Sequence, residues 1–270
     1  QTRTGRAALK NEPDSPGSLG IALSAAFEDA SGHEDTKFCW GTVMNHVLLH
    51  QTVIGQEARR QMRRAGARPD IVIGAVGGGS GFGGLIFPFY GEKRRKPRFI
   101  AVETSAYPSL TRGRYGYDFS DTSGLAPLIK MYTLGSGYMP PRISAGGMRY
   151  HGMAPLISAL YREKQIEARS YTQSEALEAA VVFSRAEGLI PSPESAYAVK
   201  AVLQEAEACK ENRERKNILF VLSANSNLDV DAFHEFVDGN TGPEEEFSSD
   251  ASKRALSELP SVSDDPNTDQ

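Results

Sequence analysis

The stretch that decides the fold is residues 71–85, IVIGAVGGGSGFGGL. It opens with a short β-branched apolar run, which is typical of a strand buried on both faces of a parallel sheet. A glycine loop follows, made of Gly77, Gly78, Gly79, Ser80 and Gly81. Glycine lets the backbone turn sharply and gather N–H groups at one point. Because residues 82–89 then read as a short helix with its positive end at the loop, the stretch predicts a phosphate site.

Two other interpretations of the loop stay open at this point. Gly79, Gly81 and Gly84 also match the spacing of a dinucleotide-binding fingerprint, with Glu103 at the distance of a ribose partner. In that fingerprint the first glycine comes straight off the strand, whereas Gly77 and Gly78 intervene here. A purely structural glycine turn is the third interpretation.

The rest of the chain alternates between apolar strands and amphipathic helices. Further strands are expected at 38–43, 98–103 and 217–223. The expected helices cover residues 19–30, 51–65, 153–163, 176–187, 194–210 and 230–237. Alternation with strands that are apolar on both sides indicates an α/β fold, a parallel sheet with helices on both faces.

Ligands of such sheets bind at the carboxyl ends of the strands. The glycine loop, Thr42, Glu103 and Ser223 all lie at such ends. Residues 104–150 are rich in Gly, Pro, Tyr and Ser and show few periods, so we expect a functional or partly structured connection there. Residues 241–270 read as a disordered acidic tail, with a short amphipathic turn near Leu256 and Leu259.

Composition excludes several classes of protein. Forty per cent of the 270 residues are apolar, and no run approaches the roughly 20 residues of a membrane helix. The tail has eight acidic and two basic residues, a net charge of −6, which leaves +2 for the first 240 residues. We therefore expect no nucleic-acid footprint, and we interpret the basic run 93–98 as a solvated loop. Cys39 and Cys209 have no metal or redox spacing and fit a cytoplasmic protein with buried thiols.

Seven longer stretches resemble the C-terminal part of tryptophan synthase β chains, in particular the variant called type 2. They are PGSLGIALSAAFED, NHVLLHQTVIGQEA, VGGGSGFGGLIFPF, AVETSAYPSLTRG, YDFSDTSGLAPLIKMYTLG, AGGMRYHGMAP and EGLIPSPESAYAVKAV. The resemblance covers roughly residues 11–239 and implies the fold-type II architecture of pyridoxal phosphate (PLP) enzymes. It implies a remnant of the mobile N-terminal domain at 1–40 and the domain that binds the PLP phosphate at 41–240.

The resemblance also implies roles for individual residues. The cofactor-binding residues would be Gly77, Gly78, Gly79, Ser80, Gly81, Thr42, Glu194 and Ser223. The loop cradles the phosphate, although the family usually has Asn at the position of Gly81. Glu194 lies beside the phenolic oxygen of the ring, and Ser223 bonds the pyridine nitrogen.

Other matching positions are less direct. After Ser223 the family commonly reads Gly-His-Gly, so Ala224 is expected to crowd the ring. The carbonyls of Tyr150 and Gly152 would bind a monovalent cation. Each role has a plainer alternative: Ser223 as a strand end, Glu194 as an acid favoured by a helix start, and His151 as a structural histidine.

The implied reaction makes L-tryptophan from L-serine and indole by β-elimination and β-replacement. The family forms homodimers and pairs with a tryptophan synthase α chain. Its Schiff-base lysine lies in a His-Lys-x-Asn segment, and none of the ten lysines here has that context. We therefore expect an N-terminally truncated chain without a catalytic residue, inactive by itself. A relative of threonine synthase or cysteine synthase and a non-catalytic phosphate-binding remnant are the alternatives.

Overall fold

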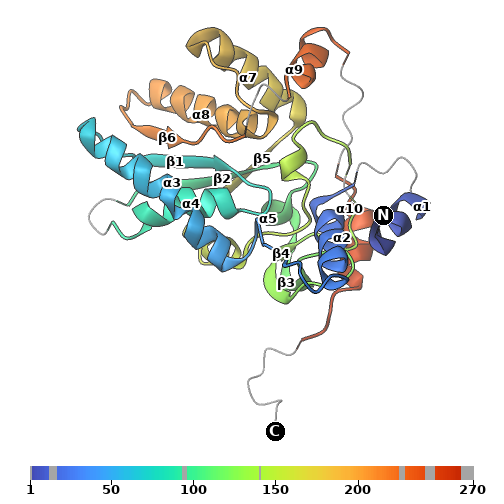
Figure 1. Ribbon diagram of the computed structural model, residues 1–270. Helices are drawn as coiled ribbons and strands as arrows, with labels where there is room; N and C mark the ends of the chain where they lie inside the picture. Colours follow the sequence, from blue (N-terminus) through green and yellow to red (C-terminus); the bar gives the residue numbers. More distant parts are fainter. Residues whose placement is uncertain are drawn as a thin grey trace.

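The computed structural model describes residues 2–11, 17–92, 96–139, 141–224, 229–240 and 247–262 (Figure 1). The helices are α1 Arg3–Asn11, α2 Leu19–Ser31, α3 Asn45–Arg64, α4 Ser80–Tyr90, α5 Ser109–Arg112, α6 Pro155–Arg162, α7 Gln173–Glu187, α8 Pro193–Glu211, α9 Val230–Val237 and α10 Ser249–Ser257. The strands are β1 Ile71–Ala75, β2 Arg98–Thr104, β3 Arg114–Phe119, β4 Leu128–Thr133, β5 Glu167–Tyr171 and β6 Ile218–Phe220. A 3-10 turn, η1, covers Gly146–Met148.

A four-stranded parallel sheet in the order β5-β2-β1-β6 forms the centre of the molecule. Alternate residues of β1 enter two different cores. Ile71 and Ile73 pack into the core that contains residues of α7 and α8, whereas Val72 packs into the core with residues of α3 and α4. Figure 1 shows these helix pairs on opposite sides of the sheet. The predicted α/β fold with a parallel sheet is therefore confirmed.

Helices α3 and α4 approach closely because glycines face each other at their contact. A Cβ at Gly55 would lie 2.3 Å from the carbonyl oxygen of Leu85, and one at Gly84 would lie 2.5 Å from that of Gln51. Helix α3 begins at Asn45, six residues before the predicted start, and α4 continues past Pro88 to Tyr90. This close contact packs the first half of α4 directly against α3.

The strand predicted at 38–43 is wrong. These residues form no regular element, and Val43 has a positive φ of 68°, which turns the chain into α3. Phe38 stacks on Phe27 at 4.0 Å between ring centroids, and Trp40 meets both rings edge-on at 5.2 Å. The aromatic residues that suggested a strand therefore pack against a helix.

The sheet edges differ from the prediction, whereas the long connection is partly structured, as expected. Strand β5 was not predicted, because Glu167, Arg169 and Ser170 give it a polar sequence. Strand β6 lies at the opposite edge, and its residues are half-buried rather than buried on both faces. Residues 104–150 contain α5 and the antiparallel hairpin of β3 and β4.

Residues 96–98 of the predicted basic loop and part of the predicted tail are ordered. Lys96 Nζ donates to Gln165 Oε1 at 2.7 Å. Arg98 forms ion pairs with Glu167 at 2.8 Å and Glu205 at 2.9 Å, while residues 93–95 lie outside the described residues. In α10, Ser252 Oγ donates to the carbonyl oxygen of Leu134 at 3.1 Å, and Ala255 is buried. Disorder therefore does not hold for residues 247–262. Within the described ranges, no helix has the length and apolarity that a membrane crossing requires.

Candidate functional site

The glycine loop forms the floor of the candidate site. Val76 N–H still donates to Val102 at the end of the sheet, at 2.8 Å. Beyond it, the backbone N–H groups of residues 77–82 donate to no acceptor within the described part of the chain. The last three of these groups belong to the first turn of α4, where the helix dipole is positive. The loop therefore offers a cluster of free donors to an anion.

Neighbouring segments contact the loop at positions where a side chain larger than that of glycine would collide with them. A Cβ at Gly77 would lie 2.5 Å from the carbonyl oxygen of Gly147, and one at Gly78 would lie 2.6 Å from Thr42 Oγ1. Gly79, at a φ of +85°, would place a Cβ 2.5 Å from Met153 Sδ. These three positions admit no side chain without movement of the surrounding atoms. Gly81 differs, because the nearest atom to its Cβ position is Gln51 Oε1 at 3.6 Å.

Thr42 and Ser80 bring two hydroxyl groups to the rim of the loop. Their oxygens lie 3.3 Å apart. Thr42 precedes Val43, whose fully buried side chain is held at a positive φ. A β-branched residue rarely adopts that conformation. The strained turn places Thr42 against Gly78, so the structure brings together Thr42 and the predicted loop residues.

Glu194, the second residue of α8, is linked to the loop through η1. Its Oε1 accepts a hydrogen bond from Gly147 N–H at 2.9 Å, and the Gly147 carbonyl lies against Gly77. Its Oε2 is buried and has no hydrogen-bond partner among the described residues. Buried polar atoms without partners are uncommon in native proteins. The unpaired oxygen is therefore able to accept a hydrogen bond from a ligand.

Ser223 is held at the start of the same helix. Ser192 Oγ and Ser195 Oγ donate to its carbonyl oxygen at 2.8 and 2.9 Å, and its own N–H donates to Ser195 Oγ at 2.8 Å. The next residue, Ala224, has a positive φ of 64°. Sequence reasoning missed Ser192 and Ser195, although Ser192 caps α8 and such a cap can be recognised before Pro-Glu.

Glu103 is not available to a ligand, which contradicts the ribose-partner interpretation. It is 1% exposed and accepts hydrogen bonds from Leu110 N–H and Thr111 N–H, both at 2.9 Å, and from Thr111 Oγ1 at 2.5 Å. Burial raises the pKa of Glu103 to about 7, although these hydrogen bonds oppose the rise. Glu103 fixes the loop after β2 and the start of α5.

The remaining candidates have structural contacts. His151 is buried, its Nε2 lies 2.9 Å from the carbonyl oxygen of Phe119, and burial lowers its pKa. Tyr150 Oη donates to the carbonyl oxygen of Ser120 at 2.8 Å, and Gly152 bridges to Thr133. The cation site at Tyr150 and Gly152 stays a prediction. No cluster of three or more metal-binding side chains occurs within the described ranges.

The arrangement can bind an anion in the loop and a polar group near Glu194. It has no lysine among the side chains that the structure places against the loop glycines. The free amides of the loop and the unpaired oxygen of Glu194 are the groups that this arrangement offers to a ligand.

Known proteins resemble the chain in sequence and in fold. The chain is 54% identical over 244 residues to tryptophan synthase beta chain 2 of Aquifex aeolicus, covering 88% of this chain and 56% of the relative. It is 50% identical over 258 residues to the protein of that name from Aeropyrum pernix, covering 94% and 58%. The chain thus spans about half the length of the curated relatives it matches.

Two solved structures share the fold at low sequence identity. A fungal L-serine ammonia-lyase from Rhizomucor miehei superposes with a TM-score of 0.60 at 12% identity, over 82% of this chain and 65% of that one. The processed form of threonine deaminase isoform 2 from Solanum lycopersicum gives 0.56 at 18% identity, over 78% and 54%. Residues 33–224 match the family described as pyridoxal-phosphate dependent enzyme. The chain belongs to this family of pyridoxal-phosphate-dependent enzymes.

Proposed function

We propose that the chain is the part of a tryptophan synthase β chain that binds the cofactor phosphate. The complete protein would join indole to L-serine to give L-tryptophan. The identity of 54% to a tryptophan synthase beta chain over 88% of the chain supports this activity. The observation that carries the proposal is the loop of free amides at residues 77–82, beside the unpaired oxygen of Glu194.

The residues present fit pyridoxal phosphate. A phosphate ester needs several donors and little side-chain bulk, and Gly77, Gly78 and Gly79 supply both conditions. The buried Oε2 of Glu194 needs a hydrogen-bond donor, which a polar substituent on a ring can supply. In this assignment the loop amides hold the phosphate, Ser80 and Thr42 line its rim, and Glu194 contacts the ring.

Pyridoxal phosphate, when bound, withdraws electron density from the α-carbon of an amino acid substrate. Ser223 would contact the pyridine nitrogen through a neutral hydroxyl. A hydroxyl group does not force that nitrogen to hold a proton, whereas a carboxylate at the same place would favour the protonated ring. Ser223 would therefore keep the nitrogen unprotonated, with Ser192 and Ser195 fixing its backbone.

Further parts of the complete protein belong to the same proposal. The lysine that bonds the cofactor covalently would come from outside these 270 residues, so the chain alone would not make tryptophan. Association as a homodimer, pairing with an α chain, and a monovalent cation at Tyr150 and Gly152 follow from the resemblance.

Titration with pyridoxal phosphate tests the site directly. We expect saturable one-to-one binding in equilibrium dialysis, with no covalent adduct at the site after borohydride. Gly79→Ala should abolish binding, because its Cβ would meet Met153 Sδ and its φ is +85°. Gly188→Ala is the matched control: its φ is +68°, nothing lies within 4 Å of its Cβ position, and it ends α7 away from the loop. Equal binding by the two variants would reject the site.

The reaction is tested separately by joining the chain to the N-terminal part of the Aquifex aeolicus relative. We expect this fusion to form tryptophan from serine and indole. Faster turnover of O-acetylserine with sulfide, or of phosphohomoserine, would favour a cysteine synthase or threonine synthase instead. Tryptophan formation by the unfused chain would disprove the assignment of the lysine to residues outside it.

A further inference from the structure

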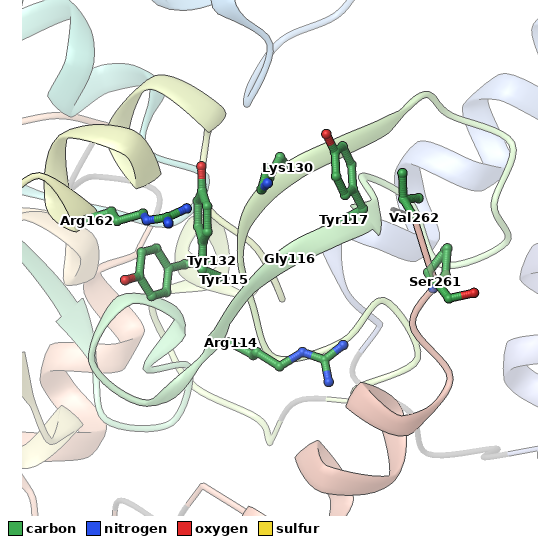
Figure 2. A pocket seen from close by; sticks show the side chains of 10 residues that line it. Arg114, Tyr115, Gly116, Tyr117, Lys130, Tyr132, Arg162, Ser261 and Val262 are labelled. Carbon is green, nitrogen blue, oxygen red and sulfur yellow. The ribbon is translucent and has the colours of Figure 1, made fainter. Parts of the chain in front are cut away.

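A pocket lies on the β3–β4 hairpin, away from the glycine loop. It has a volume of about 540 Å³, within the range of small-molecule sites. Its walls carry Arg114, Tyr115, Tyr117, Lys130, Tyr132 and Arg162, and residues 260–262 close one side. Figure 2 shows these side chains extending from the two strands and from α6, with Ser261 and Val262 on the segment after α10. We call this the hairpin pocket.

The charge of the hairpin pocket is one-sided. Arg114, Lys130 and Arg162 are cationic, and none of the described residues that line the pocket is acidic. Within the described part of the chain, neither Arg114 nor Arg162 forms an ion pair. Three cations around one concave surface attract an anion, in a protein whose net charge is −4.

Tyrosine rings contact two of these cations, Arg162 and Lys130. Arg162 Cζ lies 4.7 Å from the ring centroid of Tyr115, and Lys130 Nζ lies 5.0 Å from that of Tyr117. Cation–π contacts at exposed sites contribute only about 0.5–1 kcal/mol and leave the positive charge in place. The contact with Tyr115 therefore fixes where the guanidinium of Arg162 stands, while its N–H groups stay able to bind a ligand.

The chemistry of the cations decides what kind of anion fits. The Tyr115 ring is also packed against Tyr132 at 5.2 Å between centroids, and Tyr132 meets Tyr161 edge-on at 5.2 Å. These ring contacts support the wall from which the cations extend. Guanidinium groups match the oxygens of phosphate and carboxylate groups.

We propose that the hairpin pocket binds a small polyvalent anion carrying phosphate or carboxylate groups, held by Arg114 and Arg162 with Lys130. The ligand is distinct from the phosphorylated cofactor of the glycine loop, since no residue lines both sites. This inference does not depend on the proposed function.

Calorimetric titration of the chain at a constant ionic strength of about 0.15 M tests the proposal, because salt screens exposed charges. The probes are inorganic tripolyphosphate and citrate, which represent the phosphate and carboxylate sources. We expect saturable binding of at least one probe, weakened about tenfold by Arg162→Gln and by Arg114→Gln, as for the loss of a charged hydrogen bond. Both arginines are exposed, so both variants should keep the fold, as circular dichroism would verify.

Arg185→Gln on α7 is the matched control, because it removes the same charge from an exposed helix position outside the pocket. It should bind the probes as the unchanged chain does. Unchanged affinity in both pocket variants would overturn the proposal, since the anion would then occupy the glycine loop or bind diffusely. An equal loss in Arg185→Gln, or no saturable binding of either probe, would also overturn it. ATP binding much tighter than tripolyphosphate would refute the assignment to a small anion without a base.

Discussion

Two glutamates show how the same side chain serves different ends in two regions of this molecule. Glu103 lies near the end of β2, and Glu194 lies at the start of α8. Both follow apolar or turn-forming sequence, and both were candidate ligand contacts from sequence. The structure separates them by the number of donors around each carboxylate.

Glu103 has its hydrogen bonds supplied by the chain itself. Both of its oxygens accept, from Leu110 and from Thr111. Glu194 has one oxygen bonded to Gly147 and one that is buried without a described partner. A buried carboxylate whose donors are all present stabilises the fold, whereas one left short of a donor is open to a ligand. Substitutions of Glu103 and of Glu194 test this difference.

The largest effect is expected for Glu103, whose contribution to the free energy of unfolding should depend on pH. Its folded-state pKa is about 7, above the ordinary value of 4.5, so the folded protein binds the proton more tightly than the unfolded chain does. The stabilisation that Glu103 contributes to the folded state is therefore complete below about pH 4.5 and is lost as the pH rises to about 7. A shift of this size corresponds to about 3 kcal/mol.

Urea denaturation between pH 4.5 and 8 measures this effect as the difference between the unchanged chain and Glu103→Gln, in which the titrating group is absent. Other titrating groups cancel in the difference. If the two stability curves run parallel across this range, burial does not control the ionisation of Glu103.

A smaller effect is expected on the Glu194 side, and in a different measurement. Glu194→Gln keeps an oxygen for Gly147 N–H but replaces the unpaired Oε2 with an amide donor. We expect pyridoxal phosphate to bind about tenfold more weakly, equivalent to about 1.4 kcal/mol, because the ligand loses its acceptor. Stability should change by less than about 0.5 kcal/mol.

Equilibrium dialysis with pyridoxal phosphate measures the affinity, and Glu187→Gln at the exposed end of α7 is the charge-matched control. Glu103→Gln should bind the cofactor normally once folded. A loss of stability without a loss of affinity in Glu194→Gln would make the two glutamates equivalent and remove the distinction.

The central fold could be predicted because its signals are local. The β-branched run of β1, the glycine loop and the capping box of Thr172 and Glu175 each specify structure within a few residues. Strand β5 carried no such signal, because its pairing with β2 is set by distant residues and its side chains are polar. The apparent strand at 38–43 failed because Val43 adopts a conformation that its β-branched side chain disfavours.

The candidate site divides in the same way. The loop donors were visible in the glycine spacing, since a helix start and free amides are consequences of adjacent residues. The route from Glu194 through Gly147 to Gly77 joins segments far apart in the chain and has no sequence signature. The hydroxyl contacts of Ser192 and Ser195 to Ser223 likewise depend on how α8 meets β6. Whether the assigned residues bind cofactor stays a prediction.

The smallest effect is expected for Ala224, and it tests whether the backbone next to Ser223 is strained. Ala224 follows Ser223 with a φ of +64°, in the left-handed region that costs a residue with a Cβ about 1–2 kcal/mol. Ala224→Gly removes that cost but adds backbone freedom to the unfolded chain, so we expect a net gain of about 0.5 kcal/mol in urea denaturation. Ala65→Gly, at an ordinary φ of −76° after α3, should instead lose stability because it has no strain to release. If both variants are destabilised alike, Ala224 is not strained, and the departure from glycine after Ser223 has no conformational cost.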